Sequence, residues 1–384
     1  MKTTYYFDNA ATTFPKPEAV YTELDSFYRD FGVNVGRGQH KLASIASNKV
    51  EETRNLLLNM FHCQNNKVVF TPTATEAINL ILRSMVQDRC IVYVSPFEHN
   101  AVMRTLHAIG KQKNIDVCVL PFDLNKWQYD YEQVRHEFST KSPDVVIMSH
   151  ASNVCGFINP FLEIFELAKK YQAVTVLDMC QTAGLIDTDL STDVVSYAIF
   201  DGHKTLYGPL GVAGVIGRHF NEIEPLIYGG TGIDSANIDM PDEAPSKFEA
   251  GSINIQAIAG LNAALKWIEK TDISQIHRRE SENRSRLLDI LKSYRNIDII
   301  SPCDSDNTVG VVSCVFKGFS SDNIGNILST LNIAVRTGLH CSPMAHQTLG
   351  TFPAGTVRFS VGYFNDDEDF EALERALEYI DENS

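Results

Sequence analysis

The chain reads Val145-Val146-Ile147-Met148, then an amphipathic segment from Phe161 to Tyr171, then Val174-Thr175-Val176-Leu177. Short β-branched runs are typical of strands buried on both faces, whereas apolar residues three and four positions apart are typical of a helix. A strand, a helix and a second strand in this order form a βαβ unit with parallel strands. The stretch therefore predicts a parallel sheet covered by helices.

The same alternation continues on both sides of this stretch. Further strands are predicted at Val68-Val69-Phe70, Ile91 to Val94, Val117 to Leu120 and Ala198 to Phe200, and further helices at Glu76 to Met85, Ala101 to Lys111 and Glu132 to Phe138. The pattern changes near residue 251. Two long helical patterns follow, then two strands and an acidic helix, at Ile255 to Thr271, Ile276 to Tyr294, Val309 to Phe316, Thr356 to Val361 and Asp366 to Asp381. The sequence therefore predicts a second, smaller α/β domain.

Composition excludes several classes of protein. The 384 residues are 44% hydrophobic, and 33 basic against 48 acidic residues give a net charge of −15, with no Lys/Arg-rich block to attract nucleic acid. No apolar run is long enough to span a bilayer, and the opening segment has no signal-peptide pattern, so we expect a cytoplasmic protein that binds no membrane. The eight cysteines include no Cys-x-x-Cys pair, which argues against a metal site and leaves most of them as core residues.

Three segments carry residues suited to chemistry. Thr73 and Glu76 have capping-box spacing after a strand, so the helix that they begin presents free N–H groups that could bind phosphate, although an ordinary capped helix is the commoner reading. Asp178 ends a buried strand, where a carboxylate needs a cation such as a protonated heterocyclic nitrogen, or serves to cap the next helix. Lys204 follows His203 in an apolar setting, which favours a lysine that forms a Schiff base.

At Lys204 the residues carry a family resemblance. Asp201-Gly202-His203-Lys204, followed by Tyr207-Gly208-Pro209, resembles the pyridoxal phosphate lysine motif of the class V aminotransferase family, which contains the cysteine desulfurases. Other segments resemble the family in the same order: Phe7 to Thr13, Asn34 to His40, Glu98 to Ala101, Ser149 to Gly156 and Phe248 to Ser252. The resemblance implies a fold type I, aminotransferase-like α/β fold, with a large domain at 14–250 and a small domain at 251–384 that the segment 1–13 completes.

The resemblance also implies roles for single residues. Lys204 would attach pyridoxal 5'-phosphate, Asp178 would pair with its ring nitrogen, and His99 would stack on its ring and take part in catalysis. The remaining cofactor contacts would be Gln181, Asn153, Ala74, Thr75, His203 and Thr231, and the substrate contacts Arg358, Asn34 and Arg37. Asp201 and Ala74 depart from the family, which usually has hydroxyl residues there, and a carboxylate at Asp201 should repel the cofactor phosphate.

A second motif points to a nucleophile. Val335 to Met344 and the downstream Arg358 resemble the Arg-x-Gly-x-His-Cys-x-Pro loop and arginine of the second desulfurase group, which selenocysteine lyases share. Cys341 has polar and basic neighbours, which favour a thiolate, and Arg358 has a guanidinium suited to an α-carboxylate. The resemblance therefore implies L-cysteine as substrate, Cys341 as the persulfide carrier, a homodimer whose Gly229-Gly230-Thr231 loop reaches the partner's cofactor, and a protein or small thiol as sulfur acceptor.

Three alternatives stay open at this stage. A selenocysteine lyase would use the same residues, so the sequence does not separate selenocysteine from cysteine as substrate. A β-eliminating lyase on the same fold would not need Cys341. A non-catalytic sulfur-transfer scaffold is the alternative of another class, and Asp201 is the only sequence feature that favours it.

Overall fold

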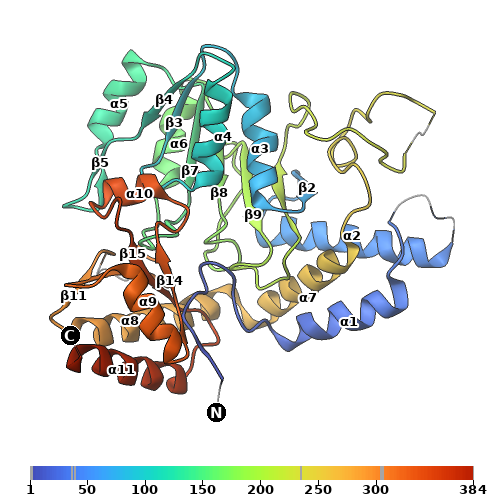
Figure 1. Ribbon diagram of the computed structural model, residues 1–384. Helices are drawn as coiled ribbons and strands as arrows, with labels where there is room; N and C mark the ends of the chain where they lie inside the picture. Colours follow the sequence, from blue (N-terminus) through green and yellow to red (C-terminus); the bar gives the residue numbers. More distant parts are fainter. Residues whose placement is uncertain (1–2, 36–37, 39, 234–235, 303–306, 384) are drawn as a thin grey trace.

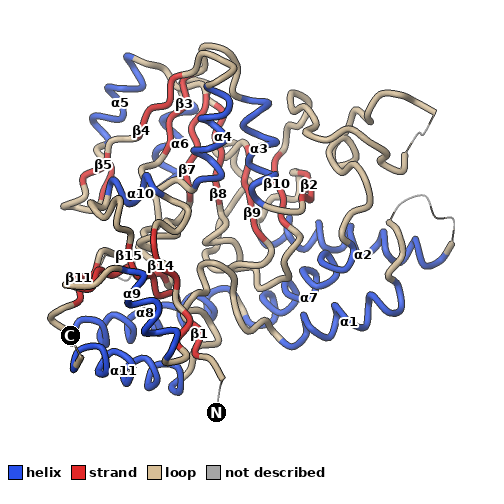
Figure 2. The backbone as a smooth tube through the Cα atoms, viewed as in Figure 1, coloured by secondary structure: helices blue, strands red, loops and turns tan. Residues whose placement is uncertain are grey.

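The computed structural model describes residues 3–35, 38, 40–233, 236–302 and 307–383. Within these residues, helices cover a seven-stranded sheet and a separate four-stranded sheet (Figures 1 and 2). No helix in the described part of the chain is both long and apolar enough to cross a bilayer. The arrangement is an α/β fold with a large, mostly parallel central sheet, as the sequence predicts.

The seven-stranded sheet forms the centre of the larger part. In spatial order its strands are β2 (Lys67–Thr71), β10 (Ala213–Gly217), β9 (Tyr197–Asp201), β8 (Val174–Asp178), β7 (Val145–Ser149), β3 (Ile91–Val94) and β4 (Asp116–Val119). Only β10 runs antiparallel to its neighbours in this sheet, and it was not predicted. The expectation of full burial is wrong for β4, because this strand lies at the sheet edge and leaves Val117 and Val119 39% and 47% exposed.

Four helices connect successive strands of this sheet: α3 (Ala74–Met85), α4 (Asn100–Gly110), α5 (Tyr131–Thr140) and α6 (Phe161–Lys169). A short hairpin, β5 (Phe122–Asp123) with β6 (Gln128–Tyr129), precedes α5. The side chains of Thr73, His99 and Asp130 cap three of the helices by accepting a backbone N–H of the first turn. These caps place the N-termini of α3 and α4 close to the strand ends from which they follow.

A second group of helices lies beside the large sheet. The long helix α7 (Ile255–Thr271) packs on both α1 (Glu18–Phe31) and α2 (Lys41–Met60) (Figure 1). The sequence analysis predicted α7 but neither α1 nor α2. The connection between β10 and α7 projects away from this group as a long loop. It exposes four large apolar side chains, those of Ile227, Tyr228, Ile233 and Ile238.

The smaller sheet has the order β11 (Ile297–Ile299), β12 (Val311–Phe316), β15 (Thr356–Ser360) and β14 (Arg336–Gly338), all antiparallel. Around it lie α8 (Ile273–Lys292), α9 (Ser321–Thr330), α10 (Pro343–Thr348) and α11 (Asp367–Glu382). The N-terminal strand β1 (Tyr5–Tyr6) pairs in parallel with β13 (Ile333–Ala334) beside α11 (Figure 2). The buried Phe7 packs edge-on against Phe359 and Phe370. These contacts support the predicted domain boundaries, which remain a prediction.

Candidate active site

A cavity of about 290 Å³ lies where the parallel strands of the large sheet end and the small sheet begins. Its floor comes from residues at the carboxyl ends of β7, β8 and β9, and its opposite wall comes from β14, β15 and the segment after β14. Ligands of open parallel sheets bind at the carboxyl ends of the strands. The topology therefore places this cavity where a ligand would contact both sheets.

Lys204 and Asp178 face the cavity from neighbouring strands. Asp178 is the last residue of β8 and is 7% exposed, and the backbone N–H of Cys180 donates to its Oδ1 at 2.9 Å. Asp178 also lines the cavity, so this buried carboxylate is suited to a cationic ligand atom. Lys204 lies three residues after β9, beyond the turn at Gly202, where an added Cβ would meet Val212 O at 2.6 Å.

The N-terminus of α3 offers a site for an anion. Thr73 caps this twelve-residue helix by accepting from Glu76 N at 3.2 Å, and Ala74 and Thr75 begin its first turn at the cavity. Unpaired N–H groups at such a terminus attract anions. A second group lies at this end of the cavity, because Nδ1 of His203 is buried and has no partner among the described residues, and it would donate to an anion when both ring nitrogens carry a proton. These groups could hold a phosphate.

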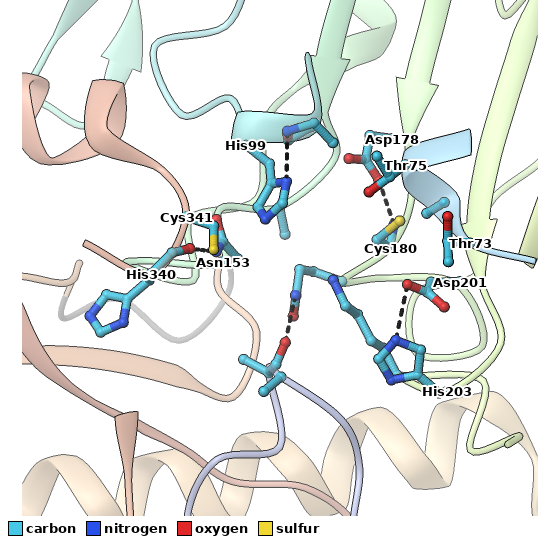
Figure 3. Close-up of a pocket in the computed structure, with 18 of the residues that line it drawn as sticks. Thr73, Thr75, His99, Asn153, Asp178, Cys180, Asp201, His203, His340 and Cys341 are labelled. Atoms are coloured by element: carbon cyan, nitrogen blue, oxygen red, sulfur yellow. Dashed lines mark hydrogen bonds and ion pairs between the residues drawn. The ribbon is translucent and has the colours of Figure 1, made fainter. Parts of the chain in front are cut away.

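Asp201 adds a negative charge to this end of the cavity. Its Oδ2 lies 3.2 Å from Nε2 of His203 (Figure 3). Burial alone would raise the pKa of the Asp201 carboxyl, but the hydrogen bond from His203 and the charges of Lys204 and His203 outweigh it and hold the pKa below its ordinary value. The carboxylate is therefore ionised at neutral pH, although its pairing with His203 offsets part of the repulsion expected toward a phosphate.

His99 reaches the cavity from the start of α4. Its Nδ1 accepts the backbone N–H of Ala101 at 3.0 Å, which leaves the proton of the neutral ring on Nε2. Burial, and then the charge of Lys204, lower the pKa of His99 to about 4, so the ring is neutral at pH 7. Figure 3 shows this ring between the Cys341 side and the Asp178 side of the cavity. A neutral aromatic ring in this place can stack on a flat ligand.

Arg358 provides a buried positive charge on β15. Its Nη2 donates to Asp8 Oδ1 at 2.7 Å and its Nη1 donates to the backbone oxygen of Asn153 at 2.9 Å. Its Nε is buried and has no partner among the described residues. Arg336 also lines the cavity, and its Nε lies 3.2 Å from the other oxygen of Asp8. Two guanidinium groups held by one carboxylate form a site suited to the carboxylate of a small ligand.

The nucleophile candidate Cys341 lies in the cysteine loop, residues 338–342, which runs from the last residue of β14 to the residue before α10. Gly338, His340 and Cys341 all have left-handed backbones, with φ of 90°, 48° and 58°. For non-glycine residues this conformation costs about 1–3 kcal/mol each, so it persists only where other contacts enforce it. The Cys341 side chain is exposed and also lines the cavity. This loop therefore presents a thiol to the same space that Lys204 reaches.

Comparison with known proteins identifies the family. The aminotransferase class-V family model matches residues 5–373, which is nearly the whole chain. The chain belongs to the class V aminotransferase family. A probable cysteine desulfurase of Halalkalibacterium halodurans is 30% identical over 97% of this chain and 92% of its own length, and one of Pyrococcus abyssi is 29% identical over 98% and 94%.

Solved structures show the same likeness. The apo structure of a cysteine desulfurase from Thermococcus onnurineus superposes on this class V chain with a TM-score of 0.91 at 27% identity, covering 99% of this chain and 95% of that one. The cysteine desulfurase CsdA from Escherichia coli gives 0.85 at 26% identity, covering 98% and 94%. These neighbours confirm the aminotransferase-like fold.

Most site residues predicted for this class V protein lie around the cavity. The structure brings together Lys204, Asp178, Gln181, His99, Asn153, Ala74, Thr75, His203, Cys341 and Arg358. Asn34 and Thr231 are not among the residues that line it, and Arg37 lies outside the described residues. Gln181 donates from Nε2 to the backbone oxygen of Ala10 at 2.9 Å, so its amide nitrogen already has a partner. The individual roles of these residues remain predictions.

Three residues that do not line the cavity form hydrogen bonds with residues that do, and they carried no role in the sequence analysis. Asp8 belongs to the quoted segment Phe7 to Thr13 but shows its function only through Arg358 and Arg336. Glu98, which precedes His99, is completely buried. Nothing in the sequence around it indicated this burial. Lys16 donates from Nζ to the backbone oxygen of His203 at 2.6 Å, and burial lowers its pKa to about 7.

Proposed function

We propose that the protein is a pyridoxal phosphate-dependent cysteine desulfurase, which converts L-cysteine to L-alanine and holds the sulfur as a persulfide on Cys341. The observation that carries the proposal is that Cys341 and Arg358 line one cavity with Lys204, which lies far from both in the sequence. A β-eliminating lyase would not require a thiol there. The comparisons support the same function, because the relatives described above are named cysteine desulfurases.

The cavity fits pyridoxal phosphate. Asp178 offers a buried carboxylate to the ring nitrogen, Lys204 offers an amine for covalent attachment, and the α3 terminus with the unpartnered His203 Nδ1 offers a place for the phosphate. His99 is neutral and can stack on the ring. The cofactor, when bound, supplies an electron sink that stabilises negative charge at the substrate Cα.

The protein's own residues account for the other steps. Arg358 Nε and Arg336 bind the α-carboxylate of cysteine, and Lys204 Nζ takes the proton from its Cα. The thiolate of Cys341 then attacks the substrate sulfur, so that an S–S bond forms as the Cβ–S bond breaks, and the electron pair of the broken bond stays with the carbon. Protons returned to this carbon fragment give alanine. One cysteine and one enzyme thiol thus yield one alanine and one persulfide, and atoms and electrons balance.

The exposure of Cys341 bears on the sulfur acceptor. Because this side chain is exposed as well as lining the cavity, a small thiol or an acceptor protein could reach the persulfide. We propose such an acceptor, and L-cysteine as the substrate rather than selenocysteine. Alanine release measured from both amino acids, with and without added thiol, tests both points, and faster release from selenocysteine would contradict the substrate assignment.

A homodimer is the proposed assembly. The loop between β10 and α7 leaves Ile227, Tyr228, Ile233 and Ile238 55%, 68%, 54% and 100% exposed. Exposed apolar groups gathered on one segment are typical of interaction sites. Thr231 lies in the same loop and does not line the cavity of its own chain, which fits a role at a partner's site. Sedimentation should show a dimer, which Tyr228→Asp weakens, whereas a fully active monomer would exclude this assembly.

Two substitutions test the function. Lys204→Ala should abolish fixation of the cofactor to the chain by borohydride, whereas a surface control, Lys141→Ala, should retain it. Cys341→Ser should keep the visible absorption of the bound cofactor but release no sulfur from cysteine, whereas Cys118→Ser, on the edge strand β4, should retain activity. Sulfide release by Cys341→Ser at the wild-type rate would refute the persulfide mechanism.

A further inference from the structure

Both polar atoms of the Asn153 side chain are engaged by the cysteine loop. Its Nδ2 donates to the backbone oxygen of His340 at 2.7 Å, and its Oδ1 accepts the hydroxyl proton of Ser342 at 2.7 Å. His340 and Ser342 are the two residues that flank Cys341. Figure 3 shows Asn153 directly beside Cys341 and His340. The contacts thus point to the nucleophile, whereas the family resemblance places this asparagine among the cofactor contacts.

The loop needs such contacts because its conformation is unfavourable on its own. His340 and Cys341 are consecutive left-handed residues, neither of which is glycine. Three further bonds hold the same segment: Asn100 N donates to Cys341 O at 2.7 Å, Ser342 N donates to Leu339 O at 2.8 Å, and His340 Nε2 lies 2.8 Å from Thr356 Oγ1. Within this set, Asn153 is the residue that binds the loop on both sides of the nucleophile.

The same residue also contacts the carboxylate site. Its backbone oxygen accepts Arg358 Nη1 at 2.9 Å. Its side chain and main chain therefore connect the loop that carries the thiol to the guanidinium that would bind the substrate carboxylate. Because Ser342 is fully buried, water does not compete for its hydroxyl. The hydrogen bond between the two side chains is thus well placed to fix the loop.

We propose that Asn153 and Ser342 form a latch that positions Cys341 relative to Arg358, so that the thiol meets the sulfur of a carboxylate-bound substrate. Asn153 is a positioning residue in this account, acting through the backbone of the loop. The proposal rests on the proposed function for its consequence in catalysis. The latch itself is a property of the folded chain and can be tested without turnover.

Hydrogen exchange in the cofactor-loaded enzyme, without substrate, is the direct test. In Asn153→Ala the amides of Ser342 and Asn100, which report on the closed loop, should exchange about tenfold faster, the effect of losing one or two hydrogen bonds. The visible spectrum and the affinity for the cofactor should stay as in the wild type. Asn262→Ala removes an asparagine that is buried between α7 and α2, away from the cysteine loop, and serves as the control.

Ser342→Ala provides a second variant that removes only a hydroxyl group. It should accelerate exchange in the same amides, and the double variant should exchange no faster than Asn153→Ala, because the hydrogen bond that Ser342→Ala removes is already lost in Asn153→Ala. In single turnovers with cysteine, both variants should lower the maximal rate of alanine release about tenfold. The cysteine concentration that gives half of this rate should change little. If Asn153→Ala weakens cofactor binding while the loop amides exchange at the wild-type rate, the residue serves the cofactor and the latch is refuted. Equal acceleration in Asn262→Ala would refute it too.

Discussion

Replacing Glu98 with glutamine should stabilise the protein above neutral pH and have little effect near pH 5. Glu98 is completely buried, and its carboxyl accepts hydrogen bonds from Ser149 N at 2.6 Å, Ser149 Oγ at 3.0 Å and Ser95 Oγ at 2.5 Å. Burial raises its pKa to about 8. A glutamine has the same shape, carries no charge and can keep these contacts, with its amide group donating to Ser149 Oγ.

The magnitude follows from the pKa difference between the folded and unfolded chain. Between the unfolded value of 4.5 and about 8, folded Glu98 holds a proton that the unfolded chain releases, so the free energy of unfolding falls as pH rises. Each pH unit costs about 1.4 kcal/mol, and the interval from pH 5 to pH 8 costs about 4 kcal/mol. Above the folded pKa, both states are ionised and the loss stops. Glutamine does not titrate, so the advantage of Glu98→Gln should grow by these amounts.

Urea unfolding followed by circular dichroism, at pH 5, 6, 7, 8 and 9 and at fixed protein and cofactor concentration, measures this difference. The buried imidazoles of His99 and His150 titrate identically in both proteins, so their contributions cancel. Glu132→Gln, which removes an exposed carboxylate from α5, should follow the wild type at every pH. A stability difference between Glu98→Gln and wild type that stays constant from pH 5 to pH 8 would refute the reasoning.

Three further substitutions test other contacts. Asp8→Asn leaves the buried charge of Arg358 without its anionic partner and should lower the free energy of unfolding by about 3 kcal/mol, whereas a change below 0.5 kcal/mol in urea unfolding would contradict the ion pair. Asp201→Ser removes a negative charge beside the proposed phosphate site, so it should increase the affinity for pyridoxal phosphate about fivefold in absorbance titrations. The affinity for pyridoxal, which has no phosphate, should not change. Equal effects on both ligands would place the phosphate elsewhere. Phe7→Ala empties a fully buried ring position and should cost about 3–5 kcal/mol, and an unchanged urea midpoint would show that β1 does not support the small sheet.

Hydrophobic periodicity predicted the strands and helices whose buried side chains are apolar and form a regular pattern in the local sequence. It found β7, β8 and the helix between them because each strand is buried on both faces and each helix has one apolar face. It missed α2, whose buried side chains include Thr53 and Arg54 and therefore interrupt the apolar pattern. It also missed β10, where Gly214 lies so close to β2 that an added Cβ would meet Val69 O at 2.4 Å. That strand depends on contacts between neighbours, which a local pattern does not contain.

The candidate site divides in the same way. Lys204 and Asp178 were predictable because Asp178 ends an apolar strand, Lys204 closely follows another, and parallel strand ends meet at one edge. Asp8 was not, since its partner Arg358 lies 350 residues away and the chain between them carries no local sign of the pairing. The contacts of Asn153 with the cysteine loop were missed for the same reason. Sequence reasoning thus identified residues whose local sequence indicates their chemistry, and it missed residues that position other side chains through long-range contacts.

The pairing of Asp8 with Arg358 also sets an order of events during synthesis. Ribosomes add about 5–20 residues per second, so the 350 residues that separate the two take about 20–70 s to make. Until Arg358 is synthesised, the Asp8 carboxylate lacks its guanidinium partner. Strand β1, which precedes Asp8, likewise has no partner strand until β13 is made. The large sheet has the opportunity to form earlier, from residues 67–217. A nascent chain that stops before β15 therefore lacks the group that would hold the substrate carboxylate, and the site is completed only after β15 has been synthesised.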